Sequence, residues 1–140
     1  MSINKILPKP THESEPYWRG CHNHELLIQQ CNNCGVFQFY PRSICTSCMS
    51  ENVEWVQSSG KGKVVTYTIV YRAPNKAFEA DLPYVIALIK LDEGPTMMSN
   101  IVHCEPKKVK IGMEVKVFFE DWSEEITIAK FMPGKTTNII

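Results

Sequence analysis

Long hydrophobic runs are missing from this chain of 140 residues, and so is any surplus of charge. No apolar run approaches the roughly 20 residues that a membrane-spanning helix needs. Fifteen basic residues balance fifteen acidic ones, and residues 61–130 alone contain ten of each kind. A chain balanced in this way has no overall field to attract nucleic acid or an anionic membrane. With 44% apolar and 21% charged residues, it has the composition of an ordinary globular protein.

A secretory signal is also missing, because the first fifteen residues are polar, contain Pro8 and Pro10, and include no apolar core segment. Six cysteines would suggest a disulfide framework in a secreted protein, but that context is absent here. We therefore expect reduced thiols and a cytoplasmic location.

Motifs of common active sites are absent as well. The chain contains no Gly-rich phosphate loop, no nucleophile elbow and no HExxH sequence. Cys21 lies near His22 and His24, and Cys104 lies beside His103. Adjacent residues on a helix do not face each other, so a Cys–His nucleophile pair is not favoured at Cys21. Cys104 is better interpreted as a small hydrophobic residue, and an autonomous enzyme that uses either cysteine is the weakest alternative.

The clearest motif is a pair of CxxC sequences separated by ten residues. Its four cysteines are Cys31, Cys34, Cys45 and Cys48. Paired knuckles of this kind predict a tetrahedral four-sulfur site, which suits zinc, with residues 36–44 between them as the hairpin of a ribbon. Gly35 permits the tight chain reversal that a knuckle requires.

Other interpretations of the four cysteines are a redox pair, disulfides, an iron–sulfur cluster or rubredoxin-like iron. Paired knuckles in a short polar segment favour a metal over redox thiols, and a structural ribbon favours zinc over iron. Because four thiolates leave no coordination position for water or substrate, we expect one structural ion that does no chemistry.

The second half of the chain has five runs rich in β-branched and aromatic residues, separated by turn signals. The runs cover residues 63–73, 83–91, 96–104, 114–120 and 126–131. Five strands in about 70 residues, the first of them long, predict a closed barrel of the OB type, with a β-sandwich as the alternative. The expected fold class is mainly β, with a rubredoxin-like zinc ribbon followed by a five-stranded OB-fold barrel.

These patterns divide the chain into four parts. Residues 1–28 form an N-terminal arm and a helical segment, in which Pro16 to Gly20 suits a first helical turn. Residues 29–57 form the zinc ribbon, residues 58–133 form the OB-fold domain, and residues 134–140 form a tail.

Several motifs together resemble one known family. They are CNNCGVFQFYPRSICTSCMS (31–50), EW (54–55), SGKG (59–62), TYTIVYRAP (66–74), LPYVIALIKLDEG (82–94) and VKIGMEVKVFFE (109–120). In this order they resemble the zinc-ribbon plus OB-fold proteins of domain-of-unknown-function family thirty-five, over residues 17–131. The chain differs from many members in having Tyr40-Pro41-Arg42 where they have Pro-Pro-Arg.

The resemblance implies a function that composition does not show. Members of this family are non-catalytic accessory subunits of thiolases, thiolase-like proteins, acyl-CoA hydratases or aldolases. The resemblance therefore implies a thiolase-type partner in a hetero-oligomer, with acyl-CoA as a ligand that both chains contact. The partner would supply the catalytic residues.

Candidate contacts with acyl-CoA or with the partner lie in two segments. The ribbon hairpin contains Phe39, Tyr40 and Arg42, and the segment after the first barrel strand contains Arg72 and Phe78. Aromatic and Arg side chains are favoured interface anchors, and Arg suits a diphosphate. Packing of the hairpin aromatics against the barrel is the competing interpretation.

A single-stranded nucleic-acid-binding module is the alternative function, because ribbons and OB barrels both bind single strands. Tyr67 and Tyr71 could stack on bases. The zero net charge argues against it, since such binding depends on phosphate neutralisation. We therefore expect no nucleic acid and no membrane among the partners.

Overall fold

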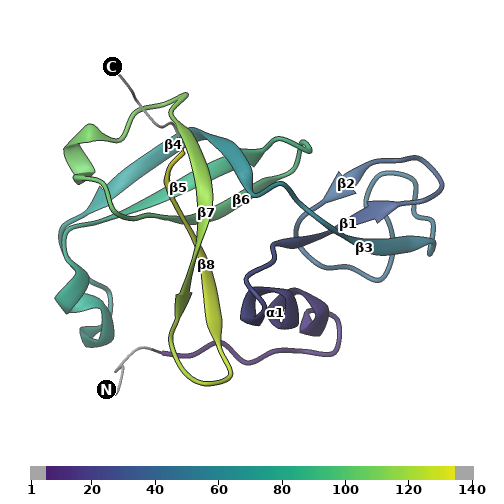
Figure 1. Cartoon of the computed structure of the whole chain (residues 1–140), viewed down its shortest axis with the longest axis horizontal. Helices are drawn as coiled ribbons and strands as arrows, with labels where there is room; N and C mark the ends of the chain where they lie inside the picture. Colours follow the sequence, from purple (N-terminus) through teal and green to yellow (C-terminus); the bar gives the residue numbers. More distant parts are fainter. Residues whose placement is uncertain (1–5, 135–140) are drawn as a thin grey trace.

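The computed structural model describes residues 6–134 and has two lobes (Figure 1). The smaller lobe is a three-stranded sheet, and the larger one is a closed barrel of five strands. The helix α1 (Glu15–His22) contacts strands of both lobes. The predicted fold class, a zinc-ribbon region followed by a five-stranded OB barrel, is confirmed. The first five residues of the arm and residues 135–140 of the tail lie outside the described residues.

The small sheet has the strand order β2-β1-β3, and both pairs are antiparallel. Its strands are β1 (Leu27–Cys31), β2 (Phe37–Gln38) and β3 (Val53–Gln57). The expected hairpin of residues 36–44 contributes only the short β2 to this sheet. The expected boundary after residue 28 falls inside β1. β3 was not predicted, and its pairing with the whole of β1 supplies most of the sheet.

The barrel has the strand order β4-β5-β6-β8-β7, closed by pairing of β4 with β7. Its strands are β4 (Lys61–Val70), β5 (Tyr84–Leu91), β6 (Thr96–Ile101), β7 (Glu114–Asp121) and β8 (Thr127–Pro133). All five predicted strands are present, with ends shifted by up to three residues. β4 is the longest, as expected, but it starts at Lys61 and so includes part of the predicted linker.

Two short 3-10 helices occupy the connections between barrel strands. η1 (Lys76–Asp81) follows β4, and η2 (Pro106–Lys108) follows β6. In η1 the Asn75 side chain accepts a hydrogen bond from the Ala77 amide at 2.8 Å, which caps the first turn. The segment between β4 and β5 is therefore an ordered wall beside the barrel.

Strand alternation explains the core. In β5 the residues Val85, Ala87, Ile89 and Leu91 are buried, and their neighbours face outward. Phe131 of β8 is fully buried among them. A Cβ on Gly62 would lie 2.6 Å from the Lys90 carbonyl oxygen, so only glycine allows β4 and β5 to approach so closely here.

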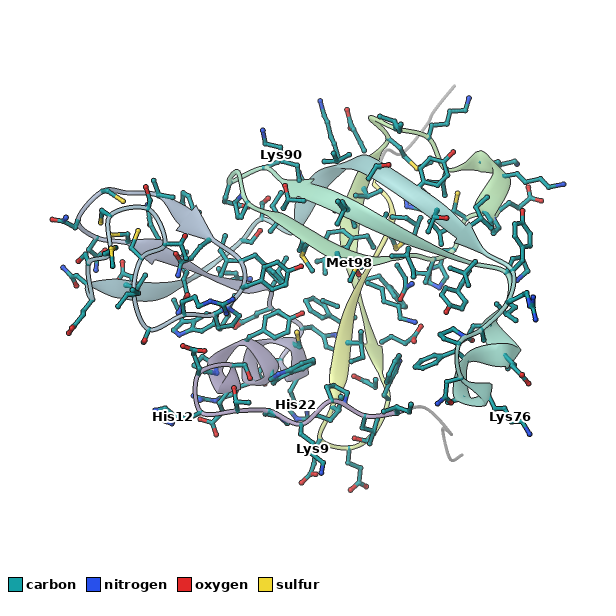
Figure 2. All side chains as sticks on the ribbon, turned by 180° about the vertical axis from the view of Figure 1, so that it is seen from behind. Lys9, His12, His22, Lys76, Lys90 and Met98 are labelled. Atoms are coloured by element: carbon teal, nitrogen blue, oxygen red, sulfur yellow. The ribbon has the colours of Figure 1, made fainter. Side chains whose placement is uncertain are left out.

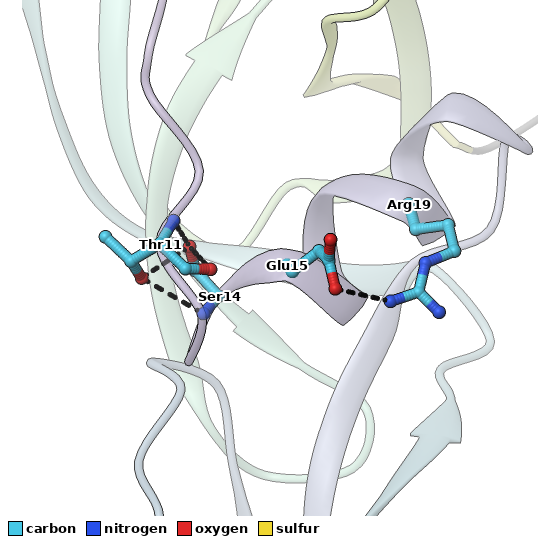
Figure 3. Close-up of polar contacts among 4 residues, drawn as sticks. All are labelled: Thr11, Ser14, Glu15 and Arg19. Atoms are coloured by element: carbon cyan, nitrogen blue, oxygen red, sulfur yellow. Dashed lines mark hydrogen bonds and ion pairs between the residues drawn. The ribbon is translucent and has the colours of Figure 1, made fainter.

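The helix α1 begins after a small hydrogen-bonded turn and matches the helical segment predicted around Pro16 (Figure 3). The Thr11 and Ser14 hydroxyls lie 2.9 Å apart, and Arg19 donates to Glu15 at 3.0 Å across one helical turn. The inner side of the helix buries Cys21, and Tyr17 packs edge-on against Phe39 of the ribbon. The helix thus joins the two lobes. No helix in residues 6–134 is long and apolar enough to span a membrane.

Candidate metal centre and candidate binding groove

The two CxxC knuckles bring four sulfur atoms together at the end of the small sheet. The Sγ atoms of Cys31, Cys34, Cys45 and Cys48 all lie within 4.8 Å of one another. Cys31 and Cys45 are buried, whereas Cys34 and Cys48 are exposed. The first knuckle joins β1 to β2, and the second lies in the loop between β2 and β3.

The sulfur separations fit one tetrahedral ion. Zn–S bonds of about 2.3 Å place the sulfurs of a tetrahedron about 3.8 Å apart. The Cys31–Cys48 and Cys34–Cys45 sulfurs are 3.6 Å apart, close to that value and far too long for a disulfide. The donor set therefore fits a closed four-thiolate site, which is the chemistry of a structural zinc.

Backbone amides in each knuckle point at the buried sulfur. The amides of Asn33 and Cys34 donate to Cys31 Sγ at 3.3 and 3.4 Å, and those of Ser47 and Cys48 donate to Cys45 Sγ at the same two distances. The Cys34 amide is the main reason that the pKa of Cys31 is lowered to about 6. The pKa of Cys45 is lowered for the same reason, chiefly by the Cys48 amide. Both sulfurs are thus prepared to bind metal as thiolates.

The chain reversal in each knuckle needs a residue with positive φ. Gly35 supplies it in the first knuckle with φ of 79°, as the sequence predicts. Met49 takes this position in the second knuckle with φ of 66°, and its amide donates to the Cys45 carbonyl at 2.9 Å. A non-glycine residue there costs conformational energy, which metal binding can offset.

Two buried glutamines hold the loop between the knuckles, and sequence reasoning missed both. Gln29 Oε1 accepts from the Arg42 amide at 3.0 Å and from Gln38 Nε2 at 2.8 Å, and Gln29 Nε2 donates to the Arg42 carbonyl. Gln38 Oε1 accepts from the Thr46 amide at 2.9 Å, and Gln38 Nε2 also donates to the Ile44 carbonyl. The sequence gives no clear signal for either, because neither was predicted to lie at an inward-facing strand position.

The three predicted contact residues of the ribbon hairpin differ in exposure. Phe39 is 8% exposed and packs edge-on between Tyr17 and Tyr40, so little of its ring is accessible. Tyr40 is 50% exposed, and its hydroxyl accepts from the Met98 amide of the barrel at 3.4 Å. Arg42 is exposed, and its guanidinium donates to the Pro41 carbonyl. Only Tyr40 and Arg42 therefore offer surface for a ligand or a partner.

A groove of about 520 Å³ lies on the outer side of the barrel, over β5 and β6. In OB folds this side, with the loops that follow the first and fourth strands, is the usual ligand-binding face. Ile86 and Asn100 line the groove together with four aromatic side chains, Phe78, Tyr84, His103 and Trp122, which form its walls. Phe78, predicted as a contact residue, is therefore in the groove, whereas Arg72 is exposed outside its lining.

A partly buried ion pair belongs to the lining of the groove. Lys130 Nζ is 2.8 Å from Glu120 Oε1, with the two side chains 10% and 35% exposed. Trp122 Nε1 donates to the same oxygen at 2.6 Å, and Lys130 Nζ lies 5.3 Å from the centre of the Trp122 ring. Sequence reasoning missed these residues, although a lysine between apolar residues of β8 was a signal.

The remaining candidates are two tyrosines and two cysteines. Tyr67 and Tyr71 do not line the groove. Cys21 is fully buried, and burial raises its pKa to about 11. Burial also raises the pKa of the half-buried Cys104, which lines the groove beside His103. Neither thiol has the lowered pKa of a nucleophile.

Two family descriptions match consecutive parts of the chain. Residues 18–54 match the family described as "ChsH2, rubredoxin-like zinc ribbon domain", and residues 55–120 match "ChsH2, C-terminal OB-fold domain". The junction between the two matches lies inside β3.

Several curated relatives match over most of the chain. A DUF35 domain-containing scaffold protein of Methanocaldococcus jannaschii is 44% identical over 77% of this chain and 77% of its own length. A probable enoyl-CoA hydratase alpha subunit of Thermomonospora curvata is 32% identical over 92% of this chain but only 40% of its own. The benzoylsuccinyl-CoA thiolase subunit BbsA of Geobacter metallireducens is 31% identical over 69% of this chain and 58% of its own.

Among solved structures, the Ltp2-ChsH2(DUF35) aldolase contains a chain with the same fold. The TM-score is 0.82 at 30% identity, and the match covers 91% of this chain and 99% of that one. The similarity therefore includes both lobes and the helix that joins them.

Proposed function

Because the chain belongs to the DUF35 family of zinc-ribbon and OB-fold proteins, we propose that it is an accessory subunit of a thiolase-type acyl-CoA-processing complex. It does not catalyse the reaction, and it helps to bind acyl-CoA and to assemble a hetero-oligomer. The observation that carries this proposal is that relatives at 31% and 32% identity are named as subunits of a CoA thiolase and an enoyl-CoA hydratase.

The metal centre supports a bracing role. The four cysteines are placed to enclose one ion, which we propose is zinc, and four thiolates would leave no coordination position for substrate. When bound, the ion neutralises thiolate charge and fixes the ribbon. The loop that carries Tyr40 and Arg42 is attached to the same lobe by the two buried glutamines. The ribbon thus presents these two side chains in a defined place.

The thiols outside the metal centre support the absence of catalysis. Cys21 has no exposed surface, and its pKa of about 11 leaves only about one thiol in a thousand ionised at pH 8. Cys104 is half-buried, and its pKa is also raised. The reacting nucleophile is therefore assigned to the partner. All six cysteines are free thiols, which is consistent with a cytoplasmic location.

The groove and the exposed arginines outside it suit different parts of acyl-CoA. The aromatic walls, including Phe78, fit an apolar acyl group. The charged lining consists of Lys130, Glu120 and Asp81, which has no net positive charge to attract phosphates. The exposed Arg42 and Arg72 lie outside this lining and suit the diphosphate.

Co-expression with a thiolase from the same genome (the same-genome thiolase) tests the proposal. Size-exclusion chromatography with light scattering should show a complex of fixed stoichiometry that survives dilution to micromolar concentration. In that complex Phe78→Ala should raise KM for a 3-ketoacyl-CoA on the order of tenfold, the loss expected for about 1.4 kcal/mol of binding.

The matched control is Ile111→Ala, which removes an exposed apolar side chain outside the groove and should leave KM unchanged. Separate elution of the two proteins at all concentrations would contradict the proposal. An unchanged KM for Phe78→Ala would contradict only the proposed contact of the groove with acyl-CoA.

A further inference from the structure

The outer side of the barrel carries a concentration of lysines that the linear sequence hides. In the antiparallel register Lys63 lies opposite Lys90, and Lys61 lies opposite Lys116. Residues opposite each other in such pairs point to the same side of the sheet. Four exposed lysines from three strands therefore form one patch, and two exposed acids border it: Glu114 lies opposite Lys63, and the Asp92 amide donates to the Lys61 carbonyl at 2.9 Å.

These lysines are not neutralised within the described chain. None of the four forms an ion pair with an acid of residues 6–134. The nearby Glu93 carboxylate is engaged by Ser58 and Ser59 at 2.8 Å each. Like charges directly opposite in a sheet destabilise it. Two pairs of opposed lysines in a chain of zero net charge indicate a surface that an anionic partner would stabilise.

An exposed apolar strip continues the same face. Leu88 lies opposite Met98 and two positions before Lys90, so its side chain is on the lysine side of β5. Met98 is 60% exposed and Leu88 is 37% exposed. The half-exposed Tyr40 reaches Met98 from the ribbon through its hydroxyl. Lys90 and Met98 are both labelled in Figure 2.

We define the docking face as Tyr40, Leu88 and Met98 together with Lys61, Lys63, Lys90 and Lys116. We propose that this face binds the partner enzyme subunit, through an apolar patch on that subunit that is bordered by Asp and Glu side chains. The inference rests on the proposed function and adds to it the surface and the chemistry of recognition.

Charge decides against a second copy of this chain as the occupant. A two-fold symmetric interface places the same patch on both sides, so it would bring lysines against lysines. The apolar centre with Met and Tyr and its charged border instead resemble the anatomy of an interface between unlike proteins. Acidic side chains of the partner would provide the negative charges that the four lysines do not find within the described chain.

The position of the face connects docking with the proposed ligand contact. Met98 belongs to the apolar strip and also lines the groove. A subunit seated on the face therefore borders the groove and can reach a ligand held there. This arrangement would let two chains share one acyl-CoA.

Binding of single variants to the same-genome thiolase, measured by calorimetry, tests the face. Met98→Glu and the double variant Lys63→Glu/Lys90→Glu should each weaken Kd by about tenfold or more. Raising the salt from about 0.1 M to about 1 M shortens the Debye length from about 10 to about 3 Å and should weaken wild-type binding more than binding of the lysine variant.

Two matched controls make the same chemical changes elsewhere. Lys107→Glu/Lys110→Glu reverses two exposed charges on the connector around η2, and Tyr71→Glu replaces an exposed apolar side chain beyond the far end of β4. Both controls should bind like the wild type. Because all altered side chains are exposed, far-UV circular dichroism should show that every variant is folded.

The outcomes separate the two proposals. If the wild type forms a complex and the face variants bind it equally well, the docking face is wrong and the proposed function stands. If no complex forms, both fail. Binding of the wild type to vesicles of phosphatidylserine and phosphatidylcholine, or to a single-stranded oligonucleotide, with loss in the same variants, would overturn the assignment of the face to a protein.

Discussion

At the scale of single residues, the six thiols occupy three environments. Four surround the metal position, Cys21 is fully buried on the inner side of α1, and Cys104 is half-buried in the lining of the groove. Backbone amides lower the pKa of Cys31 and Cys45, whereas burial raises the pKa of Cys21 and Cys104. The same side-chain type therefore serves as metal ligand in one place and as packing in another.

The environment of Cys21 predicts that it is chemically silent. Cys21→Ala should leave the turnover of the complex unchanged and lower the free energy of unfolding by about 1 to 2 kcal/mol, because it removes buried volume. In the native protein Cys21 should also react with a thiol reagent at pH 8 far more slowly than Cys104. Mass spectrometry after timed alkylation distinguishes the two, with Cys104→Ser as the control. A large loss of turnover in Cys21→Ala without unfolding would restore the enzymatic alternative.

The glutamine pair predicts a second effect at this scale. Gln38→Ala leaves the Thr46 amide and the Ile44 carbonyl without their side-chain partner, so it should destabilise the ribbon by about 1 to 3 kcal/mol. It should also release metal faster to a chelator, because Thr46 follows the ligand Cys45. Gln30→Ala, which changes a glutamine that makes one exposed bond to Gly35, is the control. Equal metal release from both variants would contradict the role of Gln38.

At the scale of elements, α1 is the joint between the lobes. Beyond the helix, His24 stacks on Phe119 of β7 with ring centres 5.2 Å apart, and His24 Nε2 is 3.6 Å from Asp121 Oδ1. Thr127 donates to the same carboxylate at 2.6 Å. That hydrogen bond, followed by His24 and His22, lowers the pKa of Asp121 below its ordinary 3.8.

The lowered pKa of Asp121 gives a pH-dependent stability. The carboxylate stabilises the fold at pH values above 3.8, and its contribution disappears as the pH falls through the lower pKa of the folded state. Asp121→Asn keeps an oxygen for Thr127 but loses the charge. Urea unfolding at matched pH should therefore show a deficit in this variant near pH 6 that vanishes at strongly acidic pH. A deficit that is independent of pH would show that charge is not involved.

Metal removal should affect the two lobes differently. Residues 32–52 bury few apolar side chains, whereas the barrel has a core of its own around Phe131 and Ile89. After treatment with a chelator, or in Cys45→Ser, amides of the ribbon should exchange hydrogen rapidly while those of β4–β8 stay protected. Elemental analysis of the untreated protein should find one zinc per chain, and visible absorbance would instead indicate iron. Unchanged protection of the ribbon would contradict the bracing role.

Much of the element pattern could be predicted from sequence, because it depends on local signals. β-branched runs and turn residues specify the five barrel strands, and the CxxC spacing brings the four sulfurs together. β3 was not foreseen because its five residues pair with β1, whose residues come 22 to 30 positions earlier in the chain, so no local signal marks it as a strand. The groove, the burial of Phe39 and the docking face depend on which strands become neighbours. Local charge balance in residues 61–130 says nothing about cross-strand register.

At the scale of the whole molecule, one lobe carries the four-cysteine site and the other is a barrel with a groove, and α1 contacts strands of both lobes (Figure 1). The ribbon loop reaches the barrel at Met98, where the docking face and the groove meet. The thiols of Cys21 and Cys104, outside the metal centre, both have a raised pKa.

The most direct test is the steady-state turnover of a 3-ketoacyl-CoA by the purified chain, by the same-genome thiolase, and by the two together. We predict no turnover by the chain alone and a higher kcat/KM for the mixture than for the thiolase alone. Turnover by the chain alone, or identical kinetics with and without it, would contradict an accessory subunit that helps to bind acyl-CoA.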